Sequence, residues 1–302
     1  MTKKADDMDF PRRYDAEDKI FNLCNVQSLK FVQFITNFDD IEERYGERYL
    51  SDDFRDLILD HVSLRKNGDL VHMEHHSVMS SSIMSRNFQF VATLHNASKR
   101  LVHPFIFNTG DIPKNTIEFA APTSFYNPII VNTQEIEESV RLNNIKYKID
   151  HNDKINIFDI YDLVWMPKYR SDRKSDDIVV ELSEIYNRLS VDDDLLSFFR
   201  NTIILWTGKF VFDRNKIEKI IGELKMTAQE VKLLEQDIID ARIDGLLCRA
   251  HDEGISKGER RGERRGEQKV ILLLLESMSP EEVSSRLQMP LDDVLEIRDS
   301  SK

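Results

Sequence analysis

The residues best suited to chemistry lie in one short stretch of the chain. Asp60 belongs to an apolar run, and Glu74 belongs to a second run that also carries three histidines. An Asn-Gly pair between the runs is a strong hairpin signal, so we expect antiparallel strands over residues 57–64 and 70–77. An aspartate and a glutamate on neighbouring strands offer the oxygen ligands that Mg²⁺ prefers. A cation held there would activate a water molecule and offset charge on a phosphate.

The turn decides whether the two carboxylates meet, because side chains alternate between the faces of a strand. A two-residue turn would put Asp60 and Glu74 on opposite faces. A three-residue turn with Gly68 in the left-handed conformation of a G1 bulge would pair Arg65 with Asp69 and set Asp60 opposite Glu74. The metal site therefore predicts the bulged turn, or a strand bend with the same effect.

Other interpretations of this stretch remain open. His72, Glu74 and His76 share one strand face and could form a transition-metal site for Zn²⁺ or Fe²⁺. The acids could also be ordinary polar positions on a solvated sheet face. Three acidic residues ahead of the hairpin are candidates for an additional metal-assisting acid: Asp39, Asp40 and Glu43.

The elements around the hairpin predict an α/β fold. Apolar residues at helical spacing follow Ser28, and a second helical pattern covers residues 83–100. Residues 102–107 are typical of a buried strand, although Pro104 favours an edge or an early position. Helix, hairpin, helix and strand in this order predict a mixed sheet with helices packed on it.

We expect four regions along the chain: a polar lead-in (1–25), the α/β core (26–170, with an insertion of uncertain form around 112–150), a helical subdomain (171–248) and a tail (249–302). Within the insertion, residues 129–131 are a candidate strand. The helical subdomain contains three apolar helical patterns, with Ser190 as the expected cap of the second.

The tail has two unusual features. Glycines recur every four residues from Gly254 to Gly266, which indicates either a charged linker or a helix whose small-residue stripe packs on a partner. The sequence from Ser279 to Glu282 predicts a capping box at the start of the first of two short helices that resemble a helix-turn-helix. The second helix carries acids that would repel phosphates, so packing or dimerisation is at least as good an interpretation as DNA reading. The acids are Asp292, Asp293 and Glu296.

Composition narrows the class of protein. The chain has 302 residues and a formal net charge of −12, which argues against non-specific coating of nucleic acid. It has no run of eighteen apolar residues and no secretory signal pattern, so we expect no membrane span and a cytoplasmic location. The two cysteines, Cys24 and Cys248, form no CxxC pair and are expected to be free thiols.

Taken together, these motifs resemble the recombination-promoting nuclease (Rpn) family, whose members are also called transposases, within the PD-(D/E)XK nuclease superfamily. The resemblance covers residues 25–110, and the glycine repeats with the Ser-Pro-Glu-Glu-Val motif extend it weakly to the tail. The residues that carry it in the core are Asp60, Val71, Met73, Glu74, His76, Ser77, Arg86 and Phe90, with the strand at 102–107.

The resemblance implies a restriction-endonuclease-like fold and DNA cleavage that depends on Mg²⁺ or Mn²⁺, with a link to DNA recombination. Asp60 and Glu74 match the two metal-binding acids. His76 stands where the superfamily has lysine and this family usually has glutamine, and it would position the attacking water. Arg86 matches an arginine at the start of the helix and is a candidate phosphate contact.

Two alternatives to an active nuclease follow from the same residues. Histidine at position 76 and the negative net charge also suit a catalytically degenerate relative that binds DNA or proteins. A metal-independent scaffold would use the glycine-striped helix as its interface. In either case we expect a homo-oligomer assembled through the tail.

Overall fold

The computed structural model describes residues 16–46, 48–50, 56–79, 81–110, 126–236, 238–239, 270–275, 278–287 and 289–300. The chain divides into two compact units. One spans Ala16–Val231, and the other includes Lys232–Lys302.

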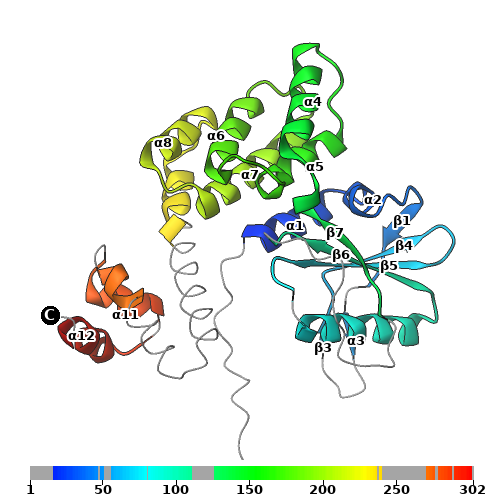
Figure 1. Ribbon diagram of the computed structural model, residues 1–302, viewed down its shortest axis with the longest axis horizontal. Helices are drawn as coiled ribbons and strands as arrows, with labels where there is room; N and C mark the ends of the chain where they lie inside the picture. Colours follow the sequence, from blue (N-terminus) through cyan, green and yellow to red (C-terminus); the bar gives the residue numbers. More distant parts are fainter. Residues whose placement is uncertain are drawn as a thin grey trace, which may run out of the picture. The chain divides into compact units, whose positions relative to one another are not determined.

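A five-stranded mixed sheet is the centre of the first unit, in the order β1-β4-β5-β6-β7 (Figure 1). Strand β4 runs antiparallel to both of its neighbours, β1 and β5, whereas β5, β6 and β7 run parallel. Their bounds are β1 (Ile41–Arg44), β4 (His61–Arg65), β5 (Leu70–His76), β6 (Val102–Asn108) and β7 (Ile129–Asn132). An α/β architecture is therefore confirmed.

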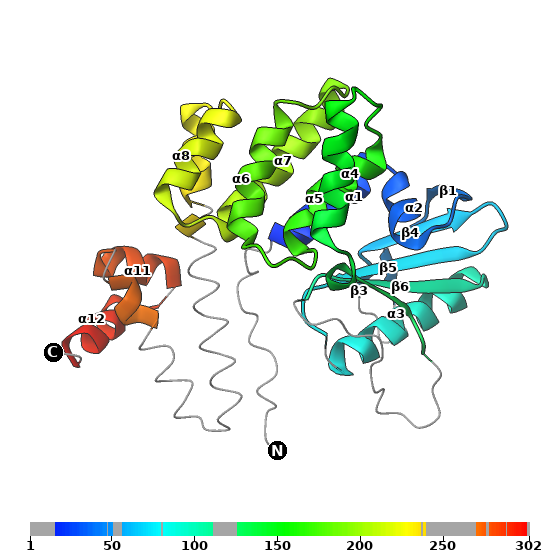
Figure 2. The ribbon, with the colours of Figure 1, turned by 45° about the horizontal axis from the view of Figure 1, so that its top comes forward.

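Helices cover both faces of this sheet. Figure 2 shows α3 (Ser81–Ser98) along one face, and α1 (Ala16–Gln27) with α2 (Lys30–Thr36) on the other. The alternation of β5 matches these two layers: Leu70 packs with Phe90 of α3, whereas Val71 and Met73 join the core beneath α1 and α2. The even-numbered residues of β5, which include the candidate metal acid, thus face the α3 side.

The strand expected over residues 57–64 is in fact two strands. Asp56–Ile58 is β3, which pairs with β2 (Arg48–Leu50) in a separate small sheet. The chain then bends at Leu59 and Asp60 before β4 begins. Pro104 lies early in β6, ahead of Phe105, where pairing with β7 begins; a proline without an N–H is tolerated there.

Residues 16–25 are not part of a loose lead-in. They belong to α1, whose Ile20, Phe21 and Cys24 side chains are fully buried. Phe21 stacks on Phe107 of β6, with ring centroids 6.2 Å apart. The helix is therefore an integral layer of the core.

The helices that follow the sheet share this core rather than forming a separate domain. A single hydrophobic cluster runs from α1 to α8, and both tryptophans, Trp165 and Trp206, are fully buried in it. The helices are α4 (Glu138–Asp150), α5 (Ile157–Trp165), α6 (Ser175–Tyr186), α7 (Asp193–Phe210) and α8 (Arg214–Glu223). Short 3-10 turns, η1 (Thr133–Glu135) and η2 (Met166–Lys168), precede α4 and follow α5.

The helix starts are set by side-chain caps. Asn156 begins α5 with a capping box, because its side chain accepts from the N–H groups of Phe158 and Asp159. Asp192, and not the expected Ser190, caps α7 by accepting from the N–H of Leu195. Of the insertion around 112–150, residues 111–125 lie outside the described residues, and the strand expected at 129–131 is confirmed as β7.

The second unit contains α11 (Pro280–Leu287) and α12 (Leu291–Ser300). The predicted capping box is confirmed: Ser279 N–H donates to Glu282 Oε2 at 2.9 Å, and Glu282 N–H donates to Ser279 Oγ at 3.3 Å. The Gly254–Gly266 repeat lies outside the described residues. None of the helices in the described part of the chain is both long and apolar enough to span a membrane.

Candidate functional site

The hairpin between β4 and β5 has the register that a carboxylate pair requires. Gly68 has a φ of +90°, and its N–H donates to the Arg65 carbonyl at 2.9 Å. Arg65 N–H in turn donates to the Asp69 carbonyl at 2.9 Å, and farther along His61 pairs with Met73. The bulged three-residue turn is confirmed.

Extending this register by one residue sets Asp60 opposite Glu74, and two hydrogen bonds fix the pair. Asp60 N–H donates to Glu74 Oε1 at 3.2 Å, and His75 N–H donates to Asp60 Oδ2 at 3.0 Å. His72 Nε2 also lies 2.8 Å from Glu74 Oε1. One oxygen of each carboxylate is therefore occupied, whereas the described residues place no hydrogen bond on Asp60 Oδ1 or Glu74 Oε2.

The two carboxyl groups differ in their protonation. Burial would raise the pKa of Glu74, which is 2% exposed, but the His72 side chain and the Asp60 N–H outweigh it and lower that pKa. The Asp60 side chain reaches solvent, yet partial desolvation of its carboxylate and the nearby charge of Glu74 raise its pKa to about 6. Glu74 is therefore ionised at neutral pH, and Asp60 loses its proton as the pH rises through about 6.

His76 lies on the same strand face as Glu74, two residues later. Burial lowers its pKa to about 4, and the charge of Arg86 acts in the same direction, so the imidazole is neutral at pH 7. Asn87 Nδ2 lies 2.9 Å from His76 Nε2, and this contact fixes the ring orientation. Arg86 itself is exposed, with its guanidinium 5.7 Å from the centre of the Phe90 ring.

The structure thus brings the predicted residues to one region. Asp60 and Glu74 are in direct contact through the Asp60 N–H, and His76 and Arg86 are close enough to act on one another electrostatically. Tyr126, just before β7, also lies near Glu74. Burial and the charge of Glu74 together raise the pKa of Tyr126. Sequence patterns gave no signal for Tyr126.

A buried ionic cluster supports the site from the opposite sheet face. His75 Nδ1 lies 2.6 Å from Asp18 Oδ1, and His75 Nε2 lies 2.9 Å from Thr109 Oγ1. Thr109 donates to Glu17, which also pairs with Lys209 and Lys168. Because His75 N–H holds Asp60, this cluster fixes the strand that positions the carboxylate pair.

The cluster could have been found in the sequence through α1. Ala16, Ile20, Phe21 and Cys24 are spaced as one apolar helix face, which would have placed Glu17 at the start of a packed helix. Burial would raise the pKa of Glu17, but the charges of Lys168 and Lys209 lower it to about 2.

The three acids proposed as metal assistants lie elsewhere. Asp40 pairs with Arg65 Nε at 2.9 Å, at the turn end of β4 and so at the opposite end of that strand from Asp60. Glu43 is exposed on β1 opposite Leu64, and Asp39 precedes that strand. Besides Glu74, the acid that acts on Asp60 is Asp18, whose charge also contributes to raising the Asp60 pKa.

The donor set suits a hard cation more than a transition metal. Asp60 and Glu74 each keep an oxygen without a hydrogen bond, and Mg²⁺ commonly binds through one or two carboxylates while keeping several waters. Among the described residues, no group of three or more His, Cys, Asp or Glu side chains is arranged to hold a metal ion. The His72–Glu74–His76 set expected as an alternative is therefore not such a group, because His72 and His76 bond to Glu74 and Asn87.

No protein-family model matches the chain, and searches of curated proteins and of solved structures each found no match. What this site does must therefore be inferred from its own geometry.

Proposed function

We propose that this protein is a divalent-cation-dependent deoxyribonuclease whose metal-binding acids are Asp60 and Glu74. The observation that carries the proposal is the hairpin register, which sets the two carboxylates opposite each other with one free oxygen each. A polar sheet face without function would gain nothing from a carboxyl group whose pKa is raised to about 6 beside a second carboxylate.

Each residue has a definite task in this proposal. His72 and the Asp60 N–H hold Glu74 Oε1, which leaves Oε2 to bind the cation. Asp60, whose pKa is about 6, would be ionised under the neutral to alkaline conditions of the assay and would contribute Oδ1 to the cation. A bound Mg²⁺ or Mn²⁺ supplies Lewis acidity that lowers the pKa of a water molecule and offsets charge on the phosphate.

His76 and Arg86 act on the substrate side of the pair. The neutral His76 ring, held by Asn87, hydrogen-bonds the attacking water in the place of the usual glutamine or lysine. Arg86 is exposed on the first turns of α3 and contacts a phosphate oxygen of the DNA.

The order of elements supports the resemblance to PD-(D/E)XK nucleases. Three antiparallel strands, β1, β4 and β5, are followed by α3 and the parallel strand β6. The pair of acids lies at the start of β4 and near the end of β5, where the resemblance implies them. A restriction-endonuclease-like core with DNA as its substrate follows from this agreement as part of the proposal.

Plasmid cleavage tests the proposal. The wild type is expected to nick supercoiled plasmid with Mg²⁺ or Mn²⁺ and to stop when EDTA is added. Asp60→Ala and Glu74→Ala should each slow nicking by about a hundredfold or more, as is typical when an electrostatic contact to the reacting group is lost. Glu43→Ala is the matched control, because it removes an exposed acid from the same sheet. Equal nicking by all four proteins would identify a contaminating nuclease and refute the assignment.

A degenerate relative that binds DNA without cutting it is the second candidate. The observation that favours it is His76, which is neutral and occupied by Asn87 where an active relative is expected to have lysine or glutamine. In that case the folded wild type is inert with every cation but still shifts DNA in a gel. Cleavage that appears only in His76→Gln would locate the loss of activity at this residue.

A further inference from the structure

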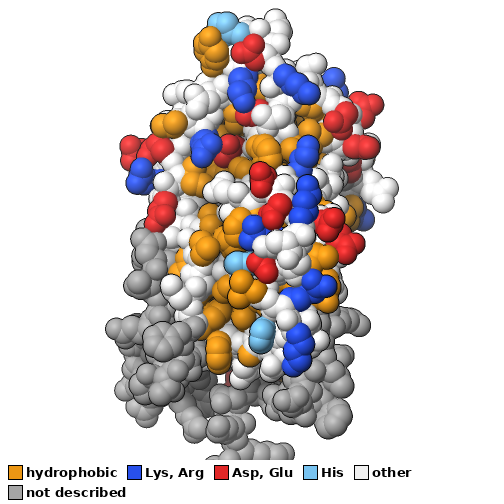
Figure 3. Space-filling view, turned by 90° about the vertical axis from the view of Figure 1, so that its right-hand side faces the viewer, with side chains coloured by type: hydrophobic (Ala, Val, Ile, Leu, Met, Phe, Trp, Pro, Cys, Tyr) orange, Lys and Arg blue, Asp and Glu red, His pale blue; other side chains and the backbone are white. Residues whose placement is uncertain are grey.

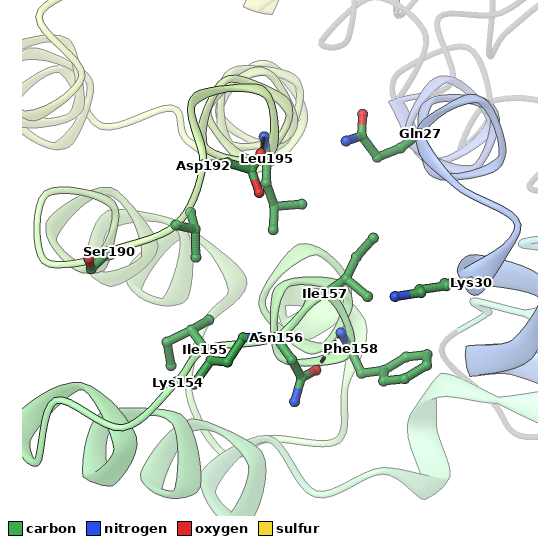
Figure 4. Close-up of a pocket in the computed structure, with 11 residues that line it drawn as sticks. Gln27, Lys30, Lys154, Ile155, Asn156, Ile157, Phe158, Ser190, Asp192 and Leu195 are labelled. Atoms are coloured by element: carbon green, nitrogen blue, oxygen red, sulfur yellow. Dashed lines mark hydrogen bonds between the residues drawn. The ribbon is translucent and has the colours of Figure 1, made fainter.

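A cavity lies between residues of α1, α2, α7 and the start of α5, within the same compact unit. It has a volume of about 620 Å³, which falls in the range of about 300–1,000 Å³ that is usual for small-molecule sites. Figure 4 shows Gln27 and Lys30 reaching into it from α1 and α2, opposite Leu195 of α7. Gln27 is nine residues beyond Asp18 on α1, which places it roughly 14 Å along the helix from Asp18.

Two lysines and one aspartate give the lining of the cavity a net positive charge. Lys30 and Lys154 both line it, both are exposed, and neither forms an ion pair among the described residues. Most other basic side chains of this unit do have acidic partners, such as Lys148 with Asp159 at 2.6 Å. Two unpaired lysines that approach one cavity from α2 and from the loop before α5 are suited to an anion that carries more than one charge.

The cavity also offers an aromatic face. Phe158 is 38% exposed, and one side of its ring stacks on Phe34 with centroids 6.4 Å apart and an interplanar angle of 16°. The buried side chains of Ile155 and Leu195 extend this apolar surface. A flat apolar group would remove the exposed part of Phe158 from water.

Hydrogen-bond acceptors complete the lining. Asp192 and Gln27 line the cavity, and Asp192 uses only Oδ1 to cap α7. Asn156 lines it too, but its Oδ1 already accepts from Phe158 and Asp159 at the start of α5. The negative charge of Asp192 would repel a ligand that is anionic throughout. It favours one that bears hydroxyl or amino donors at the end remote from its anionic group.

We propose that this cavity binds a nucleoside monophosphate, either free or as the phosphorylated end of a nucleic-acid strand. Lys30 and Lys154 bind the phosphate, Phe158 stacks on the base, and Asp192 accepts from hydroxyl or amino groups. The proposal does not depend on cleavage at Asp60 and Glu74, because no residue is shared between the two sites.

Calorimetric titration of the full-length protein tests the assignment, with AMP, adenosine and inorganic phosphate as probes. AMP is expected to bind at least tenfold more tightly than either fragment. Lys30→Gln and Lys154→Gln should each weaken AMP binding about tenfold, the effect of losing one charge-assisted hydrogen bond. Lys66→Gln is the control, because Lys66 is an exposed lysine in the β4–β5 turn, away from the cavity.

The competing outcomes are distinct. Phe158→Leu should reduce the preference for AMP over inorganic phosphate while leaving phosphate binding unchanged. Absence of AMP binding, equal binding of AMP and adenosine, or AMP binding that survives both lysine substitutions would each overturn the proposal. A 5′-phosphorylated oligonucleotide that binds tenfold more tightly than AMP would identify a strand end as the occupant, and equal affinity would identify the free nucleotide. Plasmid cleavage by the lysine variants is expected to equal that of the wild type if the ligand is the free nucleotide.

Discussion

Replacing Glu17 with glutamine removes the centre of the buried ionic cluster. The Glu17 side chain is 1% exposed, and its Oε1 lies 2.5 Å from Lys209 Nζ and 3.4 Å from Lys168 Nζ. Its Oε2 accepts from the Thr109 hydroxyl. A glutamine keeps the shape of the side chain but leaves two lysines without their shared carboxylate.

The size of the effect follows from the pKa. Lys168 and Lys209 lower the Glu17 pKa from 4.5 to about 2 against the opposing effect of burial. A difference of this size corresponds to about 3 kcal/mol of stability at neutral pH. Breaking a buried ion pair from one side typically costs about 3–5 kcal/mol, which agrees. We therefore expect Glu17→Gln to lower the free energy of unfolding by about 3 kcal/mol.

Urea unfolding at pH 7 measures this change through tryptophan fluorescence. Trp165 and Trp206 are the only tryptophans of the chain, and both are buried in the core that Glu17 borders. Glu137→Gln is the control, because the Glu137–Arg170 pair has side chains 40% and 62% exposed, and such surface pairs contribute less than about 1 kcal/mol.

The pH dependence gives an independent check with a fixed sign. A carboxyl group whose pKa is lowered by folding stabilises the protein above its unfolded pKa, and this contribution is lost as the pH falls through the folded value. The wild type should therefore lose stability relative to Glu17→Gln between pH 4.5 and about 2. A loss below 1 kcal/mol at pH 7, or parallel pH profiles for the two proteins, would refute the role assigned to the cluster.

Four further outcomes are expected. Gly68→Ala should cost about 1–2 kcal/mol in urea unfolding, because φ is +90° and a Cβ would lie 3.1 Å from Arg100 Nη1; no loss would contradict the G1 bulge. Phe107→Ala should cost about 3–5 kcal/mol in the same assay, since this fully buried ring contacts Trp165 at 4.7 Å between centroids. Asp60→Asn should raise the melting temperature in EDTA at pH 8, where the wild-type carboxyl is ionised above its pKa of about 6, and should abolish the stabilisation that Mn²⁺ gives; a lower melting temperature in EDTA would reverse the electrostatic argument. Deletion of residues 250–302 should reduce the molecular mass in light scattering to that of a monomer, and an unchanged oligomer would exclude tail-driven assembly.

Local signals in the sequence were sufficient for several elements. The Asn-Gly turn and the chemistry of Asp60 and Glu74 together predicted the bulged register, because side-chain alternation allows only one turn length to bring the acids together. The capping box at Ser279 was also predicted, as was a helix over residues 83–100, which the structure has at Ser81–Ser98, since caps and apolar periodicity act over a few residues.

Other features depended on contacts between distant parts of the chain. The expected strand is interrupted before Asp60 because Asp56–Ile58 pairs with β2 and not with β5. No local sequence pattern indicates this interruption. The single core that joins the sheet to the later helices depends on packing between α1 and α7. Helix periodicity shows which face is apolar but not which partner covers it.

The sequence by itself determined the pair of acids, the turn that aligns them and the α/β class, because each depends on residues close in the chain. Only the tertiary structure decided what surrounds them. Glu17, Thr109, Lys168 and Lys209 are separated by as many as 192 positions, and they meet because packing brings α1, β6, η2 and α7 together. Burial raises the pKa of both Asp60 and Glu17, and the nearest charges decide the outcome. Glu74 adds to the rise at Asp60, whereas Lys168 and Lys209 reverse it at Glu17, and no local motif encodes this difference.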